Sequence, residues 1–160
     1  MRGLIILGID PGLSFTGLGI INYDSKKRKF VETDWRIIKS KGDTLAERIK
    51  SIYREIEEVL ELKKPDISII ETLFFGKNTK TLIHLGELRG AIILLLSLKE
   101  IPIIEYSPRE VKMALTGSGS SSKQQVGQMV KYILGINGEI PPDATDALAT
   151  AICYLQREYG

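Results

Sequence analysis

Residues 4–12 are Leu4-Ile5-Ile6-Leu7-Gly8-Ile9-Asp10-Pro11-Gly12. A short apolar run that ends in turn residues is typical of a central strand buried on both faces. Asp10 would then lie at the carboxyl end of that strand, where open α/β sheets place their ligand sites. A carboxylate there is costly to desolvate unless a metal ion or hydrogen-bond donors compensate it. This stretch alone supports two interpretations of Asp10 equally, a site residue and a cap of the Pro-Gly turn.

The composition predicts one soluble domain that spans residues 1–160. Hydrophobic residues make up 43% of the chain and charged residues 26%, which is ordinary for a globular protein. The net charge is only +2, so an anionic partner must be met by a local basic patch. The one cysteine, Cys153, is expected to be a packed core thiol. Outside the first strand the most apolar segment, residues 91–98, is far shorter than the roughly 20 residues that span a bilayer, so we expect a cytoplasmic protein without membrane contact.

Apolar periodicity and turn residues predict the element order βββαβαβααα, a five-stranded mixed sheet flanked by helices. After the first strand, further strands are expected at residues 15–23, 29–38, 67–71 and 101–105. Helices are expected at residues 44–62, 78–100, 108–115, 123–134 and 143–157. Between the helices expected at residues 108–115 and 123–134, residues 116–122 form a Gly/Ser-rich segment that predicts a flexible polar loop.

Two acidic residues are expected to end neighbouring parallel strands. The strand at residues 67–71 follows a helix, and such a crossover returns parallel to an earlier strand. The first and third strands are parallel as well, because two antiparallel reversals separate them. Asp10 and Glu71, each the last residue of its strand, are therefore predicted at the same edge of one sheet.

The last predicted helix adds two more acids. It opens with Pro142-Asp143-Ala144-Thr145-Asp146, and residues three apart share a helix face. The helix dipole would explain one acid in a first turn, but capping alone fits poorly with two acids on one face and two at strand ends. Four gathered carboxylates raise each other's pKa values, and oxygen-only ligands favour Mg²⁺ or Mn²⁺ over zinc. The sequence thus predicts a metal-dependent phosphoryl-transfer enzyme, in which two ions about 4 Å apart promote phosphodiester hydrolysis.

The helix expected at residues 78–100 is apolar nearly all round. One face of such a helix can cover the sheet, and the remaining apolar surface indicates a partner subunit. We therefore expect a dimer in preference to burial within one chain.

A set of motifs resembles the RuvC family of Holliday-junction resolvases. The motifs occur in family order over nearly the whole chain, and they are Leu7-Gly8-Ile9-Asp10-Pro11-Gly12 with Thr16-Gly17, Ile70-Glu71 with Phe74 and Lys77-Asn78, Leu85-Gly86 with Arg89-Gly90, Val111-Lys112, Gly117-Ser118-Gly119 with Lys123, and Asp143-Ala144-Thr145-Asp146-Ala147-Leu148-Ala149. The resemblance implies a ribonuclease H-like fold and a homodimeric crossover junction endodeoxyribonuclease. Such an enzyme binds four-way junction DNA and nicks two strands symmetrically during homologous recombination and DNA repair. A complex with a branch-migration helicase is implied in the same way.

The resemblance also implies roles for individual residues. Asp10, Glu71, Asp143 and Asp146 match the family's catalytic acids, which hold two Mg²⁺ ions per subunit, with Mn²⁺ as a substitute. These four residues are the predicted catalytic and metal-binding set.

Four further residues are predicted to contact DNA. Lys112 and Lys123 match basic positions near the cleaved strand, and they flank a loop that can fold around a phosphate backbone. Phe74 matches an aromatic residue used against a junction base, and Lys77 lies in the same motif. From the residues alone, a solvated surface charge is the favoured interpretation of each lysine, and a ring packed under the loop is the favoured interpretation of Phe74.

Three alternatives remain open at this point. An ATPase or sugar-kinase-type phosphotransferase also begins with a strand that ends in Asp near a glycine, but it needs a second domain for which 160 residues leave little room. A non-catalytic junction-binding module would lack at least one of the four acids. A nuclease for RNA–DNA hybrids would share the acids and differ in the substrate that it cleaves.

Overall fold

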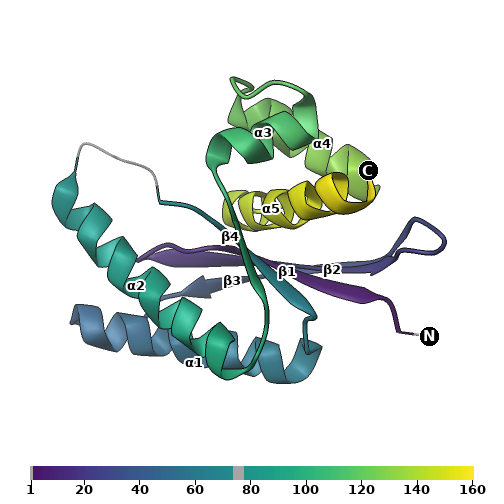
Figure 1. Cartoon of the computed structure of the whole chain (residues 1–160). Helices are drawn as coiled ribbons and strands as arrows, with labels where there is room; N and C mark the ends of the chain where they lie inside the picture. Colours follow the sequence, from purple (N-terminus) through teal and green to yellow (C-terminus); the bar gives the residue numbers. More distant parts are fainter. Residues whose placement is uncertain (1, 74–77) are drawn as a thin grey trace.

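The computed structural model of the chain describes residues 2–73 and 78–160, and five strands form one mixed sheet in the order β3-β2-β1-β4-β5 (Figure 1). The strands are β1 (Leu4–Asp10), β2 (Phe15–Asp24), β3 (Lys29–Lys39), β4 (Ile67–Glu71) and β5 (Ile103–Tyr106). The helices are α1 (Leu45–Lys63), α2 (Thr79–Leu98), α3 (Pro108–Thr116), α4 (Lys123–Leu134) and α5 (Pro142–Tyr159). The predicted order of elements and the five-stranded mixed sheet are confirmed.

The first strand is central and is covered on both faces. Ile6, Leu7 and Ile9 are completely buried. Ile6 packs in the core cluster that contains the apolar residues of α5, whereas Leu7 and Ile9 pack in the cluster that contains those of α1 and α2. This alternation follows from the twofold side-chain period of a strand. It also means that Asp10 projects toward the same side as Ile6.

The sheet register brings two acidic strand ends together. β1 pairs antiparallel with β2 and parallel with β4, and Ile9 lies opposite Ile70 in the parallel pair. The next residue of each strand is therefore acidic and lies at the same sheet edge, which confirms the prediction for Asp10 and Glu71.

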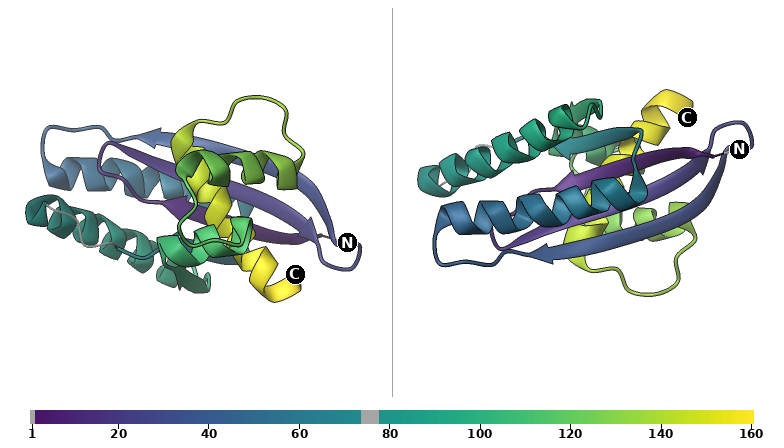
Figure 2. Two further views of the ribbon diagram at one scale, coloured as in Figure 1. Left: turned by 90° about the horizontal axis from the view of Figure 1, so that it is seen from above. Right: turned by 90° about the horizontal axis from the view of Figure 1, so that it is seen from below.

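Helices cover the sheet in two layers. In Figure 1, α3, α4 and α5 lie above the sheet and α1 lies below it, while α2 runs obliquely down to α1, with which it shares a core cluster. The view from below in Figure 2 shows α1 running along the sheet with α2 beside it, and the view from above shows α5 under α3 and α4. The site at the edge of β1 and β4 therefore has α5 on one side of the sheet and α2 on the other.

Side-chain caps determine where the helices begin. Thr44, Ser107 and Ser122 each accept a hydrogen bond from a backbone N–H in the first turn, and each belongs to a reciprocal capping box. Pro108 occupies the first turn of α3, as predicted. Because Ser122 is the cap of α4, Lys123 is the first residue of that helix.

The sequence predicted that the fifth strand begins at Ile101, but in the structure β5 begins at Ile103. The N–H of Ile101 donates to the carbonyl of Leu96 at the end of α2, so this residue still belongs to the helix terminus. Pro102 has no N–H for a strand ladder, although its carbonyl accepts a bond from Ser68.

By length and composition alone, α2 could cross a membrane. The sequence prediction rested on residues 91–98, which are far shorter than a membrane span, whereas this criterion counts the whole of α2. Core helices of soluble proteins meet the same criterion. In this structure one side of α2 packs against the sheet through Leu88, Ile92, Leu95 and Leu96.

Candidate metal and nucleic-acid site

A cavity of about 480 Å³ opens at the edge where β1 and β4 end. It combines acidic, basic and apolar side chains from five elements of the fold, β1, β4, α3, α4 and α5. Its lining residues are Asp10, Glu71, Pro108, Val111, Lys112, Lys123, Val126, Asp143, Asp146 and Ala149. The structure thus brings together all four predicted acids and two of the four predicted DNA contacts.

The strand acids reach this cavity because of the side-chain alternation in the sheet. In β4, Ile69 belongs to the core cluster on the α5 side and Ile70 to the cluster on the α2 side. Glu71 therefore projects toward α5, as Asp10 does from β1. Both carboxylates face the start of α5, where Asp143 lies in the first turn and Asp146 three residues further along.

Small residues allow α5 to lie unusually close to the strands. Gly17 pairs with Asp10 in the β1–β2 ladder, and a Cβ atom on Gly17 would lie only 2.1 Å from the carbonyl oxygen of Asp143. A Cβ on Gly8 would lie 1.9 Å from the carbonyl oxygen of Ala147. Neither contact is sterically allowed, so glycine is required at both positions. The element that these glycines admit is α5, the helix that carries two of the acids.

Burial and mutual repulsion raise the pKa values of three of these carboxyl groups. Burial is the largest cause for Asp10, followed by the charges of Asp146, Glu71 and Asp143, and together they raise its pKa from 3.8 to about 7. Burial followed by the charge of Asp146 raises the pKa of Glu71. Burial raises the pKa of Asp146 as well, although the ammonium of Lys123 opposes this. The site is therefore short of positive charge.

The donor set fits divalent cations. All four groups are carboxylates, the ligands that Mg²⁺ and Mn²⁺ prefer, and a cation would relieve the repulsion among their charges. Across residues 2–73 and 78–160, no three His, Cys, Asp or Glu side chains are already arranged as a finished ion site.

Two lysines supply positive charge at the rim of the cavity. Lys123 places its Nζ 3.6 Å from Oδ2 of Asp146, yet 87% of its side chain is exposed. Lys112 comes from α3 and is half-buried. Both ammonium groups lower the pKa of Glu71 and so oppose the effect of its burial. An ammonium that is exposed and lies next to an acidic cavity is well placed to meet a phosphate that enters it.

The Gly/Ser loop between α3 and α4 has a defined hydrogen-bond network. Oγ1 of Thr116 lies 2.8 Å from the carbonyl oxygen of Lys112 and 3.0 Å from Oγ of Ser121. The N–H of Ser118 donates to the same hydroxyl, and Gly117 ends α3 in the left-handed conformation. The predicted flexibility of this loop stays a prediction, but Thr116 is a fixed point between the two lysines that the sequence had not singled out.

Other sequence predictions have separate outcomes. Phe74 and Lys77 lie outside the described residues, so their predicted roles stay predictions. Cys153 is completely buried, and burial raises the pKa of its thiol to about 11, which confirms a packed core thiol. Sequence reasoning missed the apolar wall of the cavity, because helical positions such as Val111 and Val126 have the same pattern as any core residue.

Comparisons with known proteins agree with this geometry. Residues 6–154 match the family described as crossover junction endodeoxyribonuclease RuvC. The chain is 44% identical over 155 residues to the crossover junction endodeoxyribonuclease RuvC of Chlorobium phaeobacteroides, across 96% of this chain and 82% of that protein.

Solved structures are similar as well. Thermus thermophilus RuvC superposes with a TM-score of 0.83 and 28% identity, over 96% of this chain and 94% of that one. T. thermophilus RuvC in complex with Holliday junction substrate gives a TM-score of 0.81 and 27% identity, over 96% and 93% of the two chains. These similarities confirm the predicted ribonuclease H-like α/β fold.

Proposed function

The chain belongs to the RuvC family of crossover junction endodeoxyribonucleases, and from this premise we propose that it is a Mg²⁺-dependent, structure-selective endonuclease. Its substrate is a four-way DNA junction, which it resolves by paired symmetric nicks in homologous recombination and DNA repair. The observation that carries the proposal is the cavity in which Asp10, Glu71, Asp143 and Asp146 meet Lys112 and Lys123. Acids of this kind suit cations, and lysines beside them suit a phosphate backbone.

The four carboxylates would hold the metal ions, two per subunit. When bound there, divalent cations supply Lewis-acid stabilisation of the attacking and leaving oxygens in phosphodiester hydrolysis. The raised pKa of Asp10, about 7, means that this residue must release a proton before it can serve as a ligand in weakly acidic solution. Mn²⁺, which accepts the same oxygen donors, would substitute for Mg²⁺.

The basic and apolar residues of the cavity would position the DNA strand. Lys123 and Lys112 would contact phosphate oxygens on either side of the Gly/Ser loop, because both line the cavity and Lys123 is largely exposed. The half-open cavity has Val111 and Val126 in its wall, which limits the water that surrounds the reacting phosphate and strengthens the interactions with nearby charges. Phe74 and Lys77 are proposed to contact unpaired bases and backbone of the same junction.

We further propose that the active species is a homodimer. On α2, Ile83 and Leu94 are each 56% exposed and Leu98 is 66% exposed. The spacing of these residues places them along the side of the helix away from Leu88, Ile92 and Leu95, which are buried. Two copies joined through this surface would carry two cavities related by a twofold axis, which matches the symmetry of a four-way junction.

A solved structure of the T. thermophilus relative contains a Holliday junction substrate, and this supports the choice of junction DNA as the substrate of the present chain. The proposed location is the cytoplasm. A branch-migration helicase is the proposed partner, because a mobile junction must be moved to the position where it is cut.

The direct test is cleavage of a synthetic mobile four-way junction, with linear duplex and an RNA–DNA hybrid as alternative substrates. We expect symmetric nicks in the junction in the presence of Mg²⁺, no cleavage in EDTA, and little cleavage of linear duplex. Preferential cleavage of the hybrid would contradict junction specificity and would instead support the hybrid nuclease.

A second test separates catalysis from binding. Asp146→Asn should lower the cleavage rate by at least about 100-fold, since it removes a charge that stabilises the reacting centre, while junction affinity measured in EDTA changes little. Asp43→Asn, at an exposed residue before α1, is the matched control and should cleave at the unchanged rate. Full activity of Asp146→Asn would refute the proposed role of the acids.

A further inference from the structure

The guanidinium group of Arg89 is buried although it lies on the most apolar helix of the protein. Only 11% of its side chain is exposed, and burial of a guanidinium is strongly unfavourable unless partners compensate it. Among residues 2–73 and 78–160, its Nε has no hydrogen-bond partner. A residue selected only for the stability of α2 would not be an arginine in this position.

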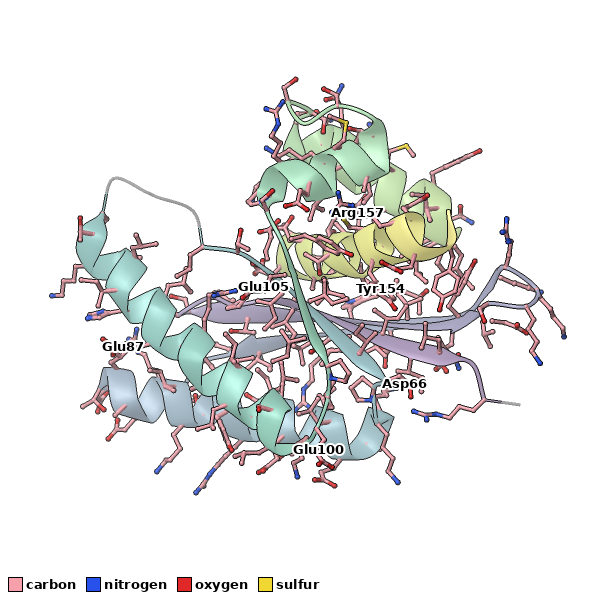
Figure 3. All side chains as sticks on the ribbon, viewed as in Figure 1. Asp66, Glu87, Glu100, Glu105, Tyr154 and Arg157 are labelled. Atoms are coloured by element: carbon pink, nitrogen blue, oxygen red, sulfur yellow. The ribbon has the colours of Figure 1, made fainter. Side chains whose placement is uncertain are left out.

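The partners of Arg89 lie on two strands of the sheet. Its Nη2 donates to the backbone carbonyl oxygen of Glu71 at 3.2 Å and to Oε1 of Glu105 at 2.7 Å. Glu105, labelled in Figure 3, lies on β5 opposite Ile70, and therefore projects toward the side of the sheet on which α2 lies. Arg89 thus approaches β4 from the α2 side, while the carboxylate of Glu71 projects from the α5 side.

This contact acts on a strand end that has few other restraints. The parallel register between β1 and β4 extends only to Ile9 and Ile70. On the other side of β4, Glu71 pairs with Tyr106, and the N–H of Thr72 donates to the carbonyl of Tyr106. Strand ends with few restraints open readily, and the hydrogen bond from Arg89 adds a restraint on the backbone of Glu71 itself.

We infer that Arg89 is a positioning residue for the metal site, which holds the end of β4 so that the Glu71 carboxylate stays directed into the cavity. The inference rests on the proposed function, because it concerns the same four acids. Groups that orient the ligands of a metal affect its affinity even though they do not touch it. Glu105 contributes to the same restraint, because its carboxylate holds the guanidinium group of Arg89 that contacts β4.

The test is the affinity for Mn²⁺ measured by isothermal titration calorimetry without DNA. We expect Arg89→Met, which retains the apolar part of the side chain, to raise the Mn²⁺ dissociation constant by about 10- to 100-fold. Arg89→Lys retains one charged donor and should recover part of the loss. Glu105→Gln leaves the bond to Glu71 in place and should show a smaller loss in the same direction.

Arg36→Met is the matched control. Arg36 on β3 pairs with Glu55 of α1 through Nη2 at 3.0 Å, so it is also a strand–helix ion pair, but it lies at the opposite end of the strand order. We expect this variant to bind Mn²⁺ like the wild type. A merely structural role of Arg89 would lower thermal stability without a change in the Mn²⁺ affinity of the folded protein.

Two outcomes would overturn the inference. One is wild-type Mn²⁺ affinity in folded Arg89→Met, and the other is an equal loss in Arg36→Met. If Arg89→Met does not fold, the inference is overturned when both Arg89→Lys and Glu105→Gln bind Mn²⁺ with wild-type affinity. If the wild type binds Mn²⁺ and cleaves junctions and Arg89→Met does both equally well, only the positioning role is refuted. A wild-type protein that binds no Mn²⁺ refutes the proposed metal site and the positioning role together.

Discussion

Asp10 is the residue at which the stability of the fold and the proposed chemistry favour opposite protonation states, because folding favours the protonated acid and metal binding needs the carboxylate. It ends a strand whose preceding residues are buried, and three other acids line the same cavity. Its pKa is about 7 in the folded chain against 3.8 for an ordinary Asp. Folding therefore favours the protonated form of Asp10, and the folded state becomes less stable as this group ionises.

This opposition predicts a pH-dependent effect of Asp10→Asn. Because the folded pKa lies above the unfolded one, the stabilising effect of the bound proton is complete below about pH 4 and is lost as the pH rises through 7. The difference between the two pKa values corresponds to at most about 4 kcal/mol. In EDTA at pH 8 we expect Asp10→Asn to be more stable than wild type by about 1–3 kcal/mol, since the amide still has to be buried.

Urea unfolding at pH 4, 6 and 8 measures this effect, and the advantage of the variant should shrink as the pH falls. Asp43→Asn, at an exposed position, should show no comparable trend. Equal stability of Asp10→Asn and wild type at pH 8 would contradict the pKa shift.

The two lysines at the cavity predict the salt dependence of junction binding. Each phosphate contact contributes about 0.9 to the slope of log affinity against log salt concentration. Lys123→Ala and Lys112→Ala should each reduce this slope by about that amount when binding is measured by fluorescence anisotropy in EDTA. Lys50→Ala on α1, which covers the opposite face of the sheet, should leave the slope unchanged. An unchanged slope for Lys123→Ala would exclude a phosphate contact at that residue.

At the scale of elements, the seating of α5 on the sheet decides where two of the four acids lie. The helix meets β1 and β2 at glycines, and its first turn passes directly over Gly17. Asp143 on that turn and Asp146 just after it can therefore approach Asp10 only because β2 has no side chain there. The structure identifies the backbone atoms in closest approach as the carbonyl oxygens of Asp143 and Ala147.

Gly17→Ala should therefore damage both stability and cleavage. Its Cβ would lie 2.1 Å from the Asp143 carbonyl oxygen, so the start of α5 must move, at a loss of about 1–3 kcal/mol. Junction cleavage should fall as well, because Asp143 and Asp146 move with the helix. Gly127→Ala on α4, whose Cβ would meet only Cγ2 of Thr145 at 3.8 Å, should be neutral or stabilise the helix by up to about 1 kcal/mol. If both variants unfold at the same urea concentration, the packing argument fails.

At the scale of the whole molecule, the two helix layers leave different surfaces. The layer of α3, α4 and α5 contains the cavity, whereas α2 in the other layer presents Ile83, Leu94 and Leu98 to solvent. A helix that is apolar on both sides is stable in water when a second surface covers it. The proposed dimer would provide that surface and would set the separation of the two cavities.

Leu94→Glu should weaken the dimer by at least about tenfold, because it places a charge in an apolar contact. Sedimentation velocity measures this effect, and cleavage of a supercoiled plasmid that extrudes a cruciform measures its consequence. Wild type should produce linear plasmid through paired nicks, and the variant should produce nicked circles. Leu62→Glu on α1, where the leucine is 77% exposed, is the matched control. A wild-type chain that sediments as a monomer at micromolar concentration would refute the dimer.

The sequence by itself determined the order of elements, the parallel pairing of the strands that end in Asp10 and Glu71, and the shared helix face of Asp143 and Asp146. These features follow from the periodicity of apolar residues and from the rule that a strand–helix–strand crossover returns parallel, and both can be read from the sequence of one chain. Only the tertiary structure decided that all four acids share one cavity with Lys112 and Lys123, that Gly17 admits the start of α5, and that Arg89 holds the end of β4 from the opposite layer. Such contacts join residues far apart in the chain, and they depend on side-chain volumes at closely packed surfaces. No local sequence pattern predicts which residues will meet there.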